Sequence, residues 1–251
     1  MKDYLEFNNN LTDFTCPHCL NAYMEIVNKN EKEYISSLKK RQFSINDEIE
    51  FDDRFYRGTI TGQMKCHRCQ EITSFIGETR FYVNYYDDEN DKEVEVEEKV
   101  ILFKYFVPSL HIIELKEEYP EEIRSVLKES FSLYFSSYSS CVNILRVLLE
   151  ELCLLNDIDK YNEEGNFISL NSRIKKLKTK LNLNDDTKTL LFALKWIGNE
   201  GSHSLKNIKK DDIDNAYIFL KELLDKLYPK DFSEYMSRAK EIEKNKGLSK
   251  K

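Results

Sequence analysis

Glycine and proline are scarce in this sequence, and long apolar runs are missing. The 251 residues include seven glycines and four prolines, so we expect a chain rich in helix rather than one built from many tight turns. No apolar run is long enough to predict a transmembrane helix. The first residues, MKDYLEFNNN, lack the apolar segment of a signal peptide, and we therefore expect a cytoplasmic protein with no membrane association.

Basic residues are also fewer than acidic residues. The chain has 38 Lys and Arg against 45 Asp and Glu, and its net charge of −7 argues against broad nonspecific DNA binding, which needs a basic surface. Hydrophobic residues make up 41% of the chain, and aromatic residues make up 12%. That content predicts a folded globular protein, at a length that suits one large domain or two small ones.

The first half of the chain favours strands. Residues 1–118 contain short runs rich in Thr, Ile, Val, Tyr and Phe, which predict a β-rich module. Within it, residues 30–40 (NEKEYISSLKK) are expected to form a helix. The acidic residues 87–99 (DDENDKEVEVEEK) are expected to form an exposed hairpin loop.

The second half favours helices. Residues 119–230 predict an α-helical bundle, in which apolar side chains recur at helical spacing. The clearest stripe consists of Val142, Leu145, Leu148, Leu149 and Leu152. Residues 231–251 form a polar C-terminal tail, for which a surface helix with a frayed end is expected. The predicted fold class is α+β.

Four of the six cysteines form two CxxC pairs, Cys16 with Cys19 and Cys66 with Cys69. Structural disulfides are not expected in a reducing cytoplasm. Each CxxC turn presents two thiolates to one ion, and two turns complete a tetrahedral Cys₄ site, so the pairs predict one structural Zn²⁺. The β-rich surroundings fit the two knuckles of a zinc ribbon, although 46 residues separate the pairs, more than a typical ribbon has.

The histidines within the CxxC pairs and the two remaining cysteines are not expected to bind metal. His18 and His67 lie inside the CxxC pairs and are not expected to be ligands, because four thiolates already fill a structural site. A thioredoxin-like redox role would need a βαβ pattern, which neither pair has. Cys141 and Cys153 lie on the apolar helical pattern and are expected to be buried, inert thiols.

The helical half resembles a bacterial family known as domain of unknown function 4145. The resemblance rests on Arg146 and Glu150 in ILRVLLEEL, on the short helix LNSRIKKLKTKL, and on the Gly-Asn-x-x-x-His ending at His203. It covers roughly residues 130–225. It implies a compact helical bundle related to the HEPN superfamily, whose members often accompany restriction and phage-defence genes, commonly act as dimers, and sometimes carry an N-terminal zinc-binding part.

The resemblance also implies a candidate site. Active HEPN proteins are metal-independent RNases with an Arg-polar-x-x-x-His motif, in which His handles a proton and Arg neutralises the scissile phosphate. Asn199 and His203 align with this motif, but Gly198 stands at the arginine position. Lys195, one helical turn earlier, or Arg146 from the neighbouring helix could restore the missing charge.

Two functions therefore remain open. In the first, the protein is a metal-independent RNase, with catalytic candidates His203, Asn199, Lys195, Arg146 and Glu150. In the second, the protein is a non-catalytic binding or regulatory protein of a phage-defence or restriction-associated system. Gly198 and Gly201 would then loosen or end their helix, and the polar side chains around them would form local hydrogen bonds.

The partners that we expect also follow from the helical half of the sequence. We expect a homodimer formed through the helical bundle, with RNA, DNA or a defence-system protein as a further partner. A basic helix face is the candidate nucleic-acid contact, with a solvated surface as the alternative. Its residues are Arg173, Lys175, Lys176, Lys178 and Lys180.

Overall fold

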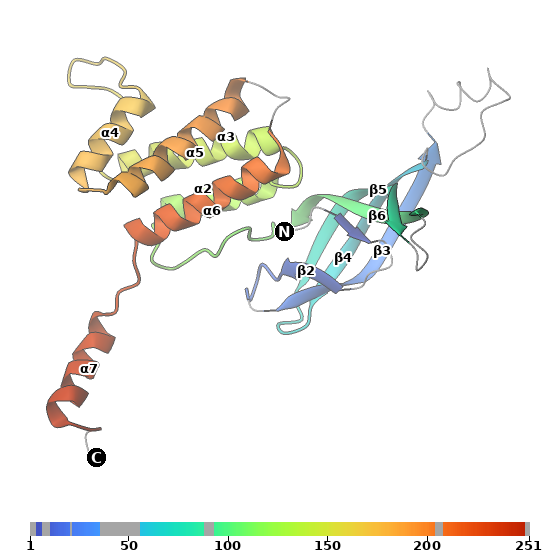
Figure 1. Ribbon diagram of the computed structural model, residues 1–251, viewed down its shortest axis with the longest axis horizontal. Coiled ribbons are helices and arrows are strands. Elements are labelled where there is room, and N and C mark those ends of the chain that lie inside the picture. The colour runs from blue at the N-terminus through green and yellow to red at the C-terminus, as the bar shows by residue number, and fades with distance from the viewer. Residues whose placement is uncertain are drawn as a thin grey trace.

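The protein is an α+β chain, seen in a computed structural model as an antiparallel sheet followed by helices (Figure 1). The structure describes residues 4–6, 11–20, 22–35, 56–87, 93–203 and 208–248. The sheet and the helices lie side by side, and the last helix stands apart from the others (Figure 1).

The sheet has six strands in the order β1-β6-β5-β4-β3-β2, all paired antiparallel. The strands are β1 (Tyr4–Glu6), β2 (Leu11–Thr15), β3 (Tyr23–Ile35), β4 (Tyr56–Cys66), β5 (Ile72–Asp87) and β6 (Glu93–Val107). Side chains alternate between a buried and an exposed face, as the period of a strand requires. On the buried face, Phe75 and Phe103 pack edge to face with ring centroids 5.2 Å apart.

Two expectations for this half are wrong in part. Residues 30–35 were expected to be helical but belong to β3, and residues 36–40 lie outside the described part of the chain. Lys99 of β6 donates to Glu31 at 2.8 Å, so tertiary contacts outweigh the helix preference of Glu and Lys. Of residues 87–99, expected to form a loop, Asp87 ends β5 and residues 93–99 begin β6, in keeping with their alternation of Glu and Val, while residues 88–92 lie outside the described part of the chain.

The helices follow in sequence order. They are α2 (Glu121–Leu133), α3 (Tyr138–Leu154), α4 (Leu170–Lys180), α5 (Asp185–His203), α6 (Lys210–Leu227) and α7 (Ser233–Asn245). Serine side chains cap two of them, because Ser137 accepts from the backbone N–H of Ser140 and Ser169 from that of Ser172. The apolar stripe expected from Val142 to Leu152 is buried on α3.

The sheet and the helices share one apolar core. Phe106 of β6 contacts Phe135 with ring centroids 5.0 Å apart. The segment between β6 and α2 is fastened to α6 by Asp225, which accepts hydrogen bonds from Lys116 and Tyr119, each at 2.6 Å. These charge-assisted bonds and the burial of Tyr119 fix the sheet relative to the bundle.

The C-terminal helix α7 makes little contact with the rest of the chain. It stands away from the bundle (Figure 1). Its Tyr235 and Met236 are exposed. Across the described residues, no helix combines the length and apolar character that crossing a membrane requires.

Candidate metal centre and helical polar site

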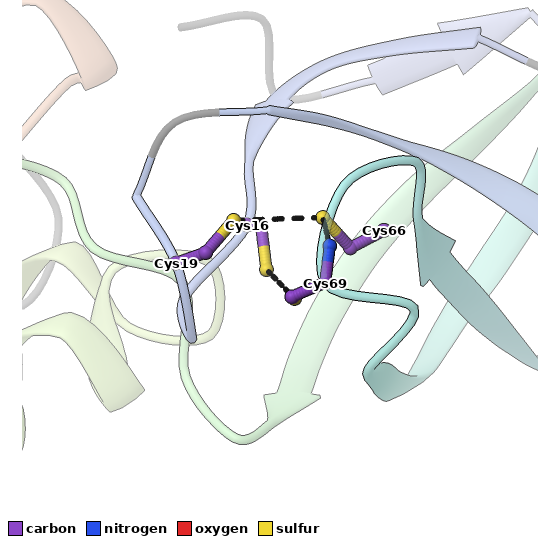
Figure 2. Close-up of side chains that lie close together, drawn as sticks. All are labelled: Cys16, Cys19, Cys66 and Cys69. Carbon is purple, nitrogen blue, oxygen red and sulfur yellow. Dashed lines mark hydrogen bonds between the residues drawn. The ribbon is translucent and has the colours of Figure 1, made fainter.

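Both CxxC pairs lie at the same end of the sheet, although they are far apart in sequence. The turn with Cys16 and Cys19 joins β2 to β3, and the turn with Cys66 and Cys69 joins β4 to β5. Strands β3 and β4 pair along their length, with Met24 opposite Cys66. The long hairpin therefore brings the second turn back beside the first, and the four side chains converge (Figure 2).

The sulfur positions fit a single tetrahedral ion. Cys16 Sγ lies 3.6 Å from Cys69 Sγ, and Cys19 Sγ lies 3.6 Å from Cys66 Sγ. All four sulfurs lie within 4.8 Å of one another. A tetrahedral site with Zn–S bonds of about 2.3 Å places its sulfurs about 3.8 Å apart. The donor set and its spacing are thus compatible with Zn²⁺, and the four cysteines would fill every coordination position.

The two turns have matching backbone geometry. Each ends in a non-glycine residue in the left-handed region, Leu20 with φ 56° and Gln70 with φ 64°. Each of these residues donates its backbone N–H to the first cysteine of its own turn, at 3.0 Å to Cys16 and 3.1 Å to Cys66. Left-handed backbone is costly for such residues and persists where surrounding contacts enforce it. The turns are therefore two copies of one local structure.

Backbone amides also point at the sulfurs. The N–H of His18 donates to Cys16 Sγ at 3.4 Å, and the N–H groups of Arg68 and Cys69 donate to Cys66 Sγ at 3.3 and 3.4 Å. Burial opposes ionisation of Cys66, but the amides of Cys69 and Arg68 outweigh it and lower the pKa of this thiol to about 6. Burial raises the pKa of Cys16 to about 12.

The remaining groups near the CxxC turns have other roles. His67 Nε2 lies 3.5 Å from Glu25 Oε2, and His18 is exposed, so neither imidazole is needed as a ligand. Cys141 and Cys153 are fully buried in α3, as expected. Burial raises the pKa of Cys141 to about 12 and that of Cys153 to about 11, which keeps both thiols protonated at neutral pH.

In the helical half, Glu150 is surrounded by cations. Its carboxylate lies 3.6 Å from Arg146 Nη2, 3.1 Å from Lys160 Nζ and 4.0 Å from Arg173 Nη1. The expected pair of Arg146 and Glu150 is therefore present, within a larger cluster. Lys160 was not anticipated, because it lies in a polar loop where no pattern in the sequence distinguishes it.

The placement of Arg173 on an outer basic face is wrong. Its side chain is 1% exposed and donates to the backbone carbonyls of Ile158 at 3.1 Å and Glu150 at 3.0 Å. It lies on the buried side of α4, with Leu170, Ile174 and Leu177. Burial of the aliphatic stem and two carbonyl acceptors make it a structural residue, unavailable to nucleic acid.

The lysines of α4 remain at the surface but differ in their pairing. Lys178 donates to Asp185 at 2.6 Å, and Lys180 donates to Asp157 at 3.0 Å. Lys175 and Lys176 are exposed, and within the described ranges neither forms an ion pair. These two lysines are therefore the available part of the predicted basic face.

Gly198 and Gly201 do not end their helix, contrary to expectation. α5 continues through both to His203. A Cβ added at Gly198 would lie 2.6 Å from Cβ of Arg146, and one at Gly201 would lie 2.6 Å from the carbonyl oxygen of Ser139. The two glycines are thus required by the close approach of α5 to α3.

The remaining candidates lie on α5. Lys195 is 8% exposed, and its Nζ lies 3.4 Å from Asn171 Oδ1 and 3.8 Å from the centre of the Trp196 ring. Lys195 thus contacts α4 and its own helix neighbour, and neither Asn171 nor Trp196 was anticipated as a site residue. Asn199 is half-buried. The side chain of His203 lies outside the described part of the structure.

Comparisons with known proteins match two family models to separate parts of the chain. Residues 128–251 match the sequence model of a family described as "Domain of unknown function (DUF4145)", and residues 5–106 match one described as "Domain of unknown function (DUF8608)". None of the curated proteins and none of the solved structures compared with the chain matches it. The chain is therefore similar to the DUF4145 family over its helical half and to the DUF8608 family over the sheet that holds the four cysteines.

Proposed function

We propose that the protein is a non-catalytic nucleic-acid-binding protein of a bacterial phage-defence or restriction-associated system. The close packing of α3 against Gly198 is the observation that supports a non-catalytic role. This residue stands where the related RNases have arginine, and α3 leaves no space there for a side chain. The exposed Lys175 and Lys176 support contact with phosphates.

In this proposal the sheet is a zinc-ribbon-like module that acts in the cytoplasm. Cys16, Cys19, Cys66 and Cys69 would hold one structural Zn²⁺, which supplies a cross-link between the two hairpin turns. Four thiolates leave no open position for substrate, so the ion stabilises the module and takes no part in a reaction. Metal analysis of purified protein should find about one zinc per chain. A stable, fully metal-free preparation would refute the zinc site.

The helical half is proposed to be a HEPN-like bundle that retains the scaffold of the RNases without their charge arrangement. Transition-state stabilisation in such enzymes needs a cation at the scissile phosphate. Arg146 packs its Cβ against the motif position, and its guanidinium is paired with Glu150 at 3.6 Å. The bundle is also the proposed homodimer interface, for which light scattering should give twice the chain mass of 29.9 kDa.

A direct test measures binding and cleavage in the same sample. Labelled RNA and DNA are incubated with the protein, with and without EDTA, then examined for a mobility shift and for strand breakage. We expect a shift without breakage, weakened by the double substitution Lys175→Glu and Lys176→Glu. The matched control is Lys178→Glu with Lys180→Glu, because these two lysines already pair with aspartates. Absence of any shift at low salt would refute the proposal.

One observation favours the alternative, a metal-independent RNase. Cβ of Arg146 on α3 lies close to Gly198. The Arg146 side chain therefore begins beside the position where the related RNases have arginine. In that case purified protein would cut RNA in EDTA, and both His203→Ala and Arg146→Ala would abolish cleavage. Intact RNA across neutral pH with the unmodified protein would exclude this alternative.

A further inference from the structure

The only tryptophan of the chain lies at the surface of the bundle. Trp196 is on α5 and is 60% exposed, which is unusual for so large an apolar ring. The Nζ of Lys195 lies 3.8 Å from the ring centre, within the range of a cation–π interaction. The indole is therefore both held in place by its neighbour and open to a ligand.

Lys195 itself is a buried charge with neutral partners. Its side chain is 8% exposed, and its hydrogen bond is to the neutral amide of Asn171 at 3.4 Å. Throughout the described residues, no carboxylate lies within ion-pair distance of its Nζ. An ammonium with neutral partners alone still attracts an anion, which would supply the opposite charge that Lys195 lacks.

The positive charge continues from Lys195 onto α4. Asn171, which accepts from Lys195, lies four residues before Lys175, and residues at this spacing share a helix face about 6 Å apart. Lys175 is exposed. In the other direction along α5, the exposed Glu200 lies one turn after Trp196 and disfavours phosphate there. The charges therefore favour a phosphate chain that passes from Trp196 toward α4.

We propose that Trp196, Lys195 and Lys175 form a binding site for single-stranded nucleic acid. One base stacks on the open surface of the indole, the adjacent phosphodiester lies at Lys195, and the strand continues over Lys175. A single strand is required because the faces of bases in a duplex are already stacked on one another. This inference rests on the proposed nucleic-acid-binding function and adds the form of the ligand and the residues that hold it.

The single tryptophan makes the test direct. The full-length protein is titrated with a uridine oligomer, a thymidine oligomer and a DNA duplex, while its intrinsic fluorescence is recorded. We expect both oligomers to quench Trp196 and the duplex to leave it unchanged at matched nucleotide concentration. Comparison of the two oligomers then shows whether RNA or DNA binds more tightly.

Variants are measured by the anisotropy of a labelled oligomer. Trp196→Ala should weaken binding about 10- to 100-fold, while Trp196→Phe, which keeps a ring, should lose much less. Lys195→Met should weaken binding and lower the slope of log affinity against log salt by about one. The matched control is Phe232→Ala, since Phe232 is a similarly exposed aromatic (56%) beyond the end of α6.

The outcomes separate this inference from the function on which it rests. Binding without tryptophan quenching, unaffected by Trp196→Ala, would overturn the site and leave nucleic-acid binding intact. No binding to any of the three ligands would overturn both. Equal loss in Trp196→Ala and Phe232→Ala would overturn the site as well, because it would show a nonspecific effect. If Trp196→Ala instead disrupted only a complex with a protein, the ligand class would be wrong.

Discussion

Replacing Gly198 with alanine tests how closely α5 packs against α3. The new Cβ would lie 2.6 Å from Cβ of Arg146 and 3.2 Å from the carbonyl oxygen of Val142. Both atoms are fixed to the backbone of α3, so a side-chain rotation cannot relieve the contact and the helices must move apart. Overpacking of this kind costs up to about 3 kcal/mol, and alanine returns about 1 kcal/mol through its helix preference. We expect a net loss of about 2 kcal/mol.

The loss is measured by thermal unfolding followed by far-UV circular dichroism. A destabilisation of this size should lower Tm by about 4–8 °C in a chain of this length. The matched control is Gly247→Ala, because a Cβ there has no neighbour within 4 Å, and we expect its stability to change by less than about 0.5 kcal/mol. A Gly198→Ala variant as stable as the parent protein would refute the close approach, and with it the reason that no arginine occupies this position.

Three further predictions concern the rest of the molecule. Cys66→Ser should lose the proposed zinc and unfold the sheet, as judged by metal analysis and proteolysis, while the helical signal remains. Asp225→Asn should destabilise the protein by about 1–3 kcal/mol at neutral pH. Its carboxyl group is desolvated, but Lys116 and Lys221 hold its pKa well below the ordinary value, so the stabilisation is present above the unfolded-state pKa and is lost as pH falls below it. Denaturant titrations of the parent and the variant should therefore converge in acid, and a constant difference would contradict the ion-pair assignment. Cys141 and Cys153, whose pKa values burial raises to about 12 and about 11, should react with a thiol reagent only after unfolding, and rapid reaction of either in the folded protein would contradict its burial.

The two CxxC turns were predictable because each is local in sequence. A CxxC pair forms its own turn, and the identity of the ligands needs no knowledge of distant contacts. The path between the pairs was less predictable. The residues from Asn30 to Ile35 have a helical composition, and it is their pairing with β4 and the contacts of Glu31 with β6 and β5 that explain why they extend β3.

In the helical half, the spacing of a residue along its helix predicted its burial better than its charge did. Arg173 begins a basic run in sequence, yet it shares the buried side of α4 with Leu170, Ile174 and Leu177, which its helical spacing already indicated. No pattern in the sequence indicated the role of Gly198 and Gly201. A glycine that ends a helix and a glycine that admits a neighbouring helix look alike in one sequence, and only the position of α3 distinguishes them.

The pairing of β3 with β4 separates the metal centre from the far end of its own hairpin. Met24 faces Cys66 beside the cysteines, and Ile35 faces Tyr56 at the other end, about 35 Å away along the strands. Residues added in pairs at that far end would keep the inside–outside alternation and leave the thiols in place. A change in the length of the segment between the two CxxC pairs would therefore act far from the thiols, and the same position offers a site for inserting a fluorescent label without disturbing the proposed zinc site.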